Sequence, residues 1–195
     1  MKNLALKSYS FIILFFSIFY LTAQEELPKG LTETERELLP QFQFNSLVIS
    51  DPPEGPVRAA AEWEEVEYLV IRWTNAYQNI LRQIVEVGVQ ECKVLITTQN
   101  ESSVTNYLTN QGVDLTNVEF LNTGSNSIWI RDYGGNTIYS DDVGERALTD
   151  WIYNRPRPLD DVMPTQHANM IGMPIYVTDT GINDLVNTGG NYMSD

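Results

Sequence analysis

Residues 129–135 read Trp-Ile-Arg-Asp-Tyr-Gly-Gly and hold the side chains best suited to chemistry. In a strand, Trp129 and Arg131 point to one face and Asp132 points to the other. A carboxylate at the end of a strand beside a Gly-Gly turn can lie at the mouth of a cleft. There its two oxygens match the planar N–H donors of a guanidinium ion. Alternatively, Asp132 accepts backbone N–H bonds within the turn and Trp129 belongs to the core.

A second segment, residues 153–161, alternates arginine with proline and then ends in two acids. The prolines stiffen the backbone, so Arg155 and Arg157 lose little freedom when they bind an anionic group such as a carboxylate. Alternatively, the two arginines form ion pairs with Asp160 and Asp161. The sequence leaves both possibilities open.

The single cysteine and the single histidine offer weaker candidates. Cys92 precedes an apolar run and is expected in the core, where a thiol is inert. His167 has no acid at a triad-like spacing and is expected to be a surface or helix-packing residue. One cysteine and one histidine also exclude an intrachain disulfide and a Cys/His zinc cluster within these 195 residues.

The composition predicts a globular protein with an acidic surface. Of the 195 residues 43% are hydrophobic and 19% are charged, which suits one buried core. The 12 basic residues face 26 acidic ones, for a net charge of −14. With no basic surface to neutralise phosphates, nucleic acid and anionic membranes are not expected partners.

The first 24 residues have the order of a secretory signal peptide: Lys2 and Lys7, an apolar run at 11–21, then Thr-Ala-Gln. The alternative is a membrane anchor, but crossing a bilayer takes about 20 apolar residues. We therefore expect a protein that is secreted, on the cell surface or periplasmic, and bacterial. Residues 25–61 contain five prolines and are expected to form an extended lead-in with at most one short helix.

The mature chain has the pattern of an α/β protein. Buried strands are predicted at 68–71, 93–98 and 118–121, alternating with helices around 77–85 and 103–108. In the first helix the apolar residues at 77, 80, 81, 84 and 85 fall on one face, and Ser102 or Ser103 is expected to cap the second. Strand-like segments at 127–130, 136–139 and 146–153 follow, with turns at 134–135 and 141–144 that suggest antiparallel pairing. A helix at 162–170 and short strands at 175–177 and 185–186 complete the prediction.

Three segments together resemble a known family. Ala-Glu-Trp-Glu at 61–64, Trp-Ile-Arg-Asp-Tyr-Gly at 129–134 and Gly-Gly-Asn at 189–191 occur in the order seen in the bacterial, Porphyromonas-type peptidylarginine deiminase and agmatine deiminase family. The resemblance covers about residues 61–195 and implies a pentein fold, a five-bladed α/β propeller of ββαβ-type units. On this view residues 62–195 form the N-terminal part of the deiminase domain, about its first two blades.

The resemblance also implies an activity, the hydrolysis of a guanidine group through a cysteine thiolate, without metal or cofactor. Asp132 matches the acid that binds the guanidinium, and Trp129 matches the aromatic ring that packs on the arginine side chain. Arg155 and Arg157 match an arginine pair that holds the C-terminal carboxylate of a peptide. Thr188 stands where agmatine deiminases usually have a glutamate, which favours the peptidylarginine branch.

The family's proton-transfer histidine, second acid and nucleophilic cysteine all follow the Gly-Gly-Asn segment. Neither Cys92 nor His167 lies in a matching motif. We therefore expect residues 1–195 to be the N-terminal part of a secreted deiminase that acts on arginine in peptides, and to be inactive alone. The alternatives are an agmatine deiminase, which acts on a small guanidine compound, and a secreted binding module that keeps the scaffold without the chemistry.

Overall fold

The structure is a computed structural model that describes residues 27–43, 53, 55–140, 145–177 and 185–195. The predicted signal peptide and the turn at 141–144 lie outside the described residues. The helices are α2 (Glu33–Leu38), α3 (Gln78–Gly88), α4 (Glu101–Asn110), α5 (Ile130–Tyr133), α6 (Pro158–Asp161) and α7 (Met163–Ile171), with 3-10 turns η1 (Leu39–Gln41), η2 (Asn75–Tyr77) and η3 (Gly189–Asn191). The strands are β1 (Val57–Ala59), β2 (Tyr68–Arg72), β3 (Lys93–Thr98), β4 (Val118–Asn122), β5 (Asn136–Ser140), β6 (Arg146–Asp150), β7 (Ile152–Tyr153), β8 (Ile175–Val177) and β9 (Val186–Asn187).

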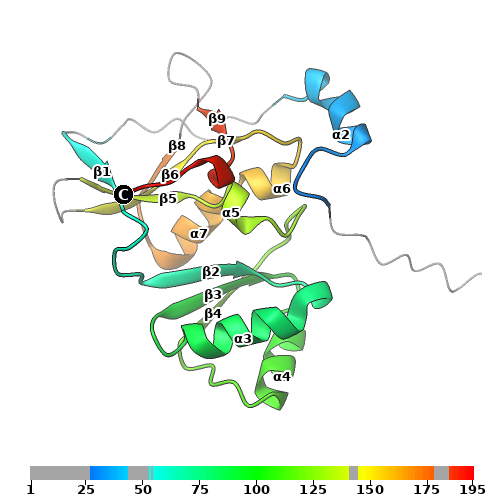
Figure 1. The fold of residues 1–195 in the computed structure, drawn as a ribbon, viewed down its shortest axis with the longest axis vertical. Coiled ribbons are helices and arrows are strands. Elements are labelled where there is room, and N and C mark those ends of the chain that lie inside the picture. The colour runs from blue at the N-terminus through cyan, green and yellow to red at the C-terminus, as the bar shows by residue number, and fades with distance from the viewer. Residues whose placement is uncertain (1–26, 44–52, 54, 141–144, 178–184) are drawn as a thin grey trace, which may run out of the picture.

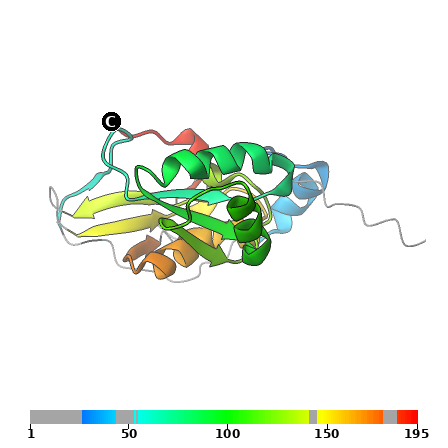
Figure 2. The same cartoon turned by 90° about the horizontal axis from the view of Figure 1, so that it is seen from below.

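Strands β2, β3 and β4 form a parallel sheet, as the alternation of strands and helices predicted. The central strand β3 is buried from its second residue to its last, because helices and strands cover both of its faces. Figure 1 shows α3 and α4 on one side of this sheet, and Figure 2 shows the molecule from below, with α3 running alongside the sheet. The core between them is apolar and contains Ile71, Trp73, Val85, Val94, Ile96, Val104, Leu108 and Val113.

Two local predictions for these helices need correction. The cap of α4 is Asn100, whose side chain accepts a hydrogen bond from the Ser103 N–H, and not Ser102 or Ser103 themselves. The apolar face predicted for α3 is only partly covered, because Val85 is buried while Ile80 and Ile84 remain exposed. The sheet therefore covers the part of the apolar face that contains Val85 and leaves the part with Ile80 and Ile84 exposed.

The second sheet has the order β1-β5-β6-β8. Strands β1, β5 and β6 are antiparallel neighbours, which confirms the predicted pairing of residues 136–139 with the strand that starts at Arg146. Strand β8 pairs with β6 in parallel, and a short parallel pair, β7 with β9, follows. The sheet starts at Val57, so the predicted lead-in contributes its first strand.

The strand predicted at 127–130 is wrong: Ile130 begins the short helix α5, and Trp129 is its N-cap residue. The backbone here has other partners than a strand. The N–H groups of Asn126 and Ser127 donate to the Asp160 carboxylate at 2.6 and 3.1 Å, and the Asp132 N–H donates to the Trp129 carbonyl. A backbone whose bonds are satisfied in this way has none left for a sheet.

No helix among the described residues is long and apolar enough to cross a membrane.

Candidate functional site

The site forms where η3 packs against α5. A Cβ atom on Gly189 would lie 2.1 Å from the Arg131 carbonyl oxygen, and one on Gly190 would lie 2.5 Å from Asp132 Oδ1. Only residues without a side chain allow this approach. The Gly-Gly segment and the Asp132 segment, far apart in the sequence, therefore meet in the fold.

Asp132 is buried, with 3% of its surface exposed. The Thr188 hydroxyl donates a hydrogen bond to its Oδ1 at 2.9 Å. The ammonium group of Lys29 lies 3.7 Å from the same oxygen, and the Lys29 side chain is 59% exposed. The carboxylate is thus held from inside by a neutral donor and faces a cation on its outer side.

Trp129 lies beside this carboxylate at the start of α5. Its indole N–H donates to the Leu27 carbonyl at 2.8 Å, and its ring packs against a small buried cluster of Tyr133, Tyr153 and Met163. Trp129 is therefore only partly in the core.

Arg157 is almost completely buried, with 1% of its surface exposed. Its Nε and Nη2 donate to the two Glu35 oxygens at 2.7 and 3.1 Å, and Nη2 also donates to the carbonyls of Pro28 and Gly30. Its Nη1 has no hydrogen-bond partner among the described residues. Burial disfavours both charges, but their hydrogen bonds outweigh it, so the pKa of Glu35 lies below its usual value and that of Arg157 above it.

Arg155 is half-buried, and it too is directed toward the N-terminal segment. Its Nε donates to the Lys29 carbonyl at 3.3 Å, and its Nη1 donates to Asn154 Oδ1 at 2.6 Å. Among the described residues the ion pair of Arg157 is with Glu35, so the alternative in which Asp160 and Asp161 neutralise the arginines is wrong for Arg157.

Asp160 and Asp161 instead hold the backbone of the site. Asp160 is fully buried and accepts three hydrogen bonds, two from backbone N–H groups and one from the Ser127 hydroxyl at 2.7 Å. Asp161 accepts from the Tyr153 N–H at 2.7 Å. Burial raises the pKa of both carboxyls. These supporting roles were missed from the sequence, where an acid pair beside two arginines indicates ion pairing.

Tyr153 lies at the centre of these groups, 1% exposed, with its ring 5.9 Å from that of Tyr133. Its pKa is raised to about 12, chiefly by burial; the charges of Arg157 and Arg155 lower this pKa, and those of Asp160 and Asp132 raise it. Tyr153 is therefore a neutral phenol. Nothing in the sequence distinguished it from the chain's other tyrosines.

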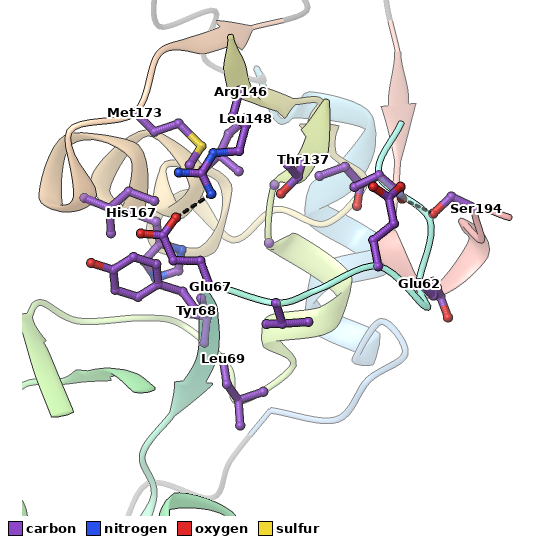
Figure 3. A pocket seen from close by; sticks show the side chains of 18 of the residues that line it. Glu62, Glu67, Tyr68, Leu69, Thr137, Arg146, Leu148, His167, Met173 and Ser194 are labelled. Carbon is purple, nitrogen blue, oxygen red and sulfur yellow. Dashed lines mark hydrogen bonds and ion pairs between the residues drawn. The ribbon is translucent and has the colours of Figure 1, made fainter. Parts of the chain in front are cut away.

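A separate cavity of about 550 Å³ lies between β2 and the β5–β6 pair (Figure 3). Glu67 and Arg146 form an ion pair in it, and Asp132 is not among its lining residues. His167 lines its inner wall with one ring nitrogen 2.9 Å from the Thr97 hydroxyl, and burial lowers its pKa to about 4. A buried, neutral His167 agrees with the packing role expected for it.

Cys92 is half-buried just before β3, rather than within the core. Within the ranges that the structure describes, no three His, Cys, Asp or Glu side chains gather closely enough to hold a metal ion.

Comparison with known proteins gives the family. Residues 56–195 match the model of the Porphyromonas-type peptidyl-arginine deiminase family. Agmatine deiminase of C. jejuni is similar in structure, with 25% identity and a TM-score of 0.55 over 69% of this chain and 42% of that protein. A variant of the same enzyme with substrate bound gives 24% identity and a TM-score of 0.57 over 72% and 44%.

A structure described as the putative arginine deiminase of Porphyromonas gingivalis has 15% identity and a TM-score of 0.56 over 69% of this chain and 43% of that protein. The chain therefore spans less than half the length of these proteins. Their mixed α/β fold is the fold found here. The match over 56–195 shows that the chain belongs to the Porphyromonas-type peptidyl-arginine deiminase family.

Proposed function

We propose that the protein to which this chain belongs is a secreted deiminase that hydrolyses the guanidine group of arginine in peptides to citrulline and ammonia. The observation that carries the proposal is Asp132, a buried carboxylate fixed by Thr188 whose outer side faces a cation. A substrate guanidinium would take the place of that cation. The proposal includes the five-bladed propeller, of which this chain would supply about two blades.

The proposed reaction has two steps. A cysteine thiolate attacks the guanidinium carbon, and the C–N bond to one amino group breaks as that nitrogen takes a proton and leaves as ammonia. Water then attacks the same carbon, the C–S bond breaks, and the ureido product and the thiolate are released. Splitting the reaction in this way replaces one difficult step by two easier ones.

Within this chain, Asp132 would bind and orient the guanidinium, because a charge-assisted pair with a planar cation fixes its plane as well as its position. Trp129, next to α5, would pack on the aliphatic part of the arginine side chain. The cysteine and histidine would come from the part of the protein that follows the Gly-Gly-Asn segment.

The arginine pair supports a substrate with a free carboxylate. Arg155 is half-buried, and Arg157 keeps one buried N–H group without a partner among the described residues. A buried donor without a partner is costly, and a carboxylate oxygen would satisfy it. This favours a C-terminal arginine as the preferred substrate.

Agmatine is the second candidate substrate, because a structurally similar agmatine deiminase has been solved with its substrate bound. Agmatine carries a guanidinium but no carboxylate. It would use Asp132 without using Arg155. Arg155→Gln would therefore weaken turnover of C-terminal arginine and leave agmatine turnover unchanged. If agmatine is the true substrate, the unmodified protein would turn over agmatine in preference to peptides.

The largest effect on function is expected for Asp132→Asn in the full-length protein. The substitution removes the charge that pairs with the guanidinium, and losing one partner of a buried charge pair costs several kcal/mol, so turnover of peptidyl-arginine should fall about 100-fold or more. Citrulline formation measures it.

Asp114→Asn is the matched control, because Asp114 is an exposed acid whose only hydrogen bonds within the described part of the chain come from Thr116 in its own turn. It should keep full activity. Equal activity of the Asp132→Asn variant and the unmodified protein would refute the role given to Asp132.

A further inference from the structure

The N-terminal segment 27–35, called here the N-terminal arm, contacts all four residues predicted to bind substrate. The Leu27 carbonyl accepts from Trp129, and the Lys29 ammonium faces Asp132. The Lys29 carbonyl accepts from Arg155, while the Pro28 and Gly30 carbonyls and the Glu35 carboxylate accept from Arg157. In Figure 1 this arm runs from α2 to the side of α6.

The charges of the arm match those of the proposed substrate. A peptide that ends in arginine offers a side-chain cation for Asp132 and a carboxylate for the arginine pair. The arm offers the cation of Lys29 and the carboxylate of Glu35 in the same two places. A built Cβ on Gly190 would lie 3.2 Å from the Lys29 ammonium, so this cation fills the space that Gly190 leaves in front of Asp132.

We propose that the N-terminal arm is an internal substrate mimic, which occupies the guanidine site at Asp132 through Lys29 and the carboxylate site at Arg157 through Glu35, and competes with substrate. This inference rests on the function proposed above. When the cation and the carboxylate of the arm occupy the site, substrate cannot bind. The arm therefore lowers the fraction of molecules whose site is open and raises the apparent KM.

The Lys29–Asp132 contact and the Glu35–Arg157 contact differ in strength, and this difference determines which end of the arm would leave the site first. Glu35 is fixed by the capping box of α2, in which the Thr32 N–H donates to Glu35 at 2.8 Å, and its partner Arg157 is buried. Lys29, in contrast, is mostly exposed and meets Asp132 at the longer distance of 3.7 Å. Exposed pairs are weak, so the Lys29 end would leave first and the Glu35 end would keep the arm attached.

The kinetic test replaces Lys29 by glutamine in the full-length protein. Without its cation the arm competes less well, so KM for a peptide ending in arginine should fall about 3- to 10-fold while kcat stays unchanged. Arg36→Gln is the control, since Arg36 is an exposed cation on α2 that pairs with Glu33 and not with the site. An unchanged or increased KM for Lys29→Gln would overturn the proposal.

The second test does not depend on activity. Hydrogen exchange of the backbone amides at 29–35 is measured with free L-arginine, which carries both a guanidinium and a carboxylate, and with L-citrulline, which lacks the guanidinium cation. The proposal expects arginine to speed exchange in the arm several-fold and citrulline to have little effect. Exchange that stays the same while the protein turns over arginine would overturn the mimic but leave the proposed function intact.

The opposite result is also informative. If no guanidine compound is turned over by any variant, yet arginine still speeds exchange in the arm, the proposed reaction is wrong and the competition between the arm and a guanidinium ligand is supported.

Discussion

The parallel sheet with its two helices and the region around α5 are both well buried, but different groups fill them. In the first, most of the fully buried side chains are apolar, as with Val94, Ile96 and Leu108, and Thr97 is a polar exception. In the second, they include Arg157 and Asp160, each at most 1% exposed. Apolar burial stabilises without regard to partner, whereas each buried polar group needs a particular partner. Many combinations of apolar residues could therefore stabilise the first region. The second region depends on particular pairs of polar groups, which hold its side chains at fixed positions, as a binding site requires.

Leu108→Ala tests the apolar region and should have the largest effect on stability. Leu108 is fully buried between α4 and the sheet, so its loss removes apolar contact and leaves a cavity. The expected loss is about 3 kcal/mol in the free energy of unfolding, measured by denaturation in urea. No single substitution of a neighbouring polar residue should restore it.

Leu159→Ala is the control, because Leu159 on α6 is 45% exposed. Its effect should stay below about 1 kcal/mol. Equal losses for the two leucines would mean that the apolar region does not carry the stability assigned to it.

Arg157→Met tests the region around α5, where stability depends on paired polar groups and not on apolar contact. The single change leaves the Glu35 carboxylate without its partner, and the free energy of unfolding should fall by about 2–3 kcal/mol. In the double variant Arg157→Met with Glu35→Met, most of that loss should return, because no unpaired charge remains. A double variant that loses the sum of the two single effects would show that the pair is not coupled.

The same contrast explains what could be predicted from the sequence. The bounds of β3 and β8 were predicted to the residue, because runs of β-branched residues and their turns are local features. The strand prediction for residues 127–130 was wrong, because the backbone N–H of Ser127 donates to the Asp160 carboxylate, 33 positions away. No local pattern reports such a partner.

The residues of the site also differ in whether the sequence alone could identify them. Asp132 and the Gly-Gly segment could be selected because they stand in motifs, and the structure brings them together through Thr188. Glu35 could not be selected from the sequence, because it stands in the proline-rich stretch that is expected to form an extended lead-in. Its burial depends on Arg157, 122 positions later, and pairings at that separation have no signature in a single sequence.

A smaller effect, on the pH dependence of stability, is expected from Asp150 at the end of β6. Burial first, and the nearby charge of Asp161 second, raise its pKa to about 8. In the unfolded chain an aspartate titrates near 4, so between these values the folded state holds a proton that the unfolded state has released. Stability should therefore fall as pH rises through this window, by about 1 kcal/mol per pH unit in its middle.

Asp150→Asn should remove the part of this slope that Asp150 contributes between pH 5.5 and 7.5, while Asp160 and Asp161, whose pKa values burial also raises, keep theirs. Asp114→Asn, which changes an exposed acid whose pKa is lowered, should leave the slope in place. Unfolding in urea at several pH values measures both. His167 acts in the opposite sense, since its pKa of about 4 costs stability as pH falls below about 6.5, so the slope from Asp150 is clearest at the upper end of the range. An Asp150→Asn variant that keeps the original slope would show that Asp150 is already ionised in the folded protein, so that burial at this position does not hold the carboxyl in its neutral form.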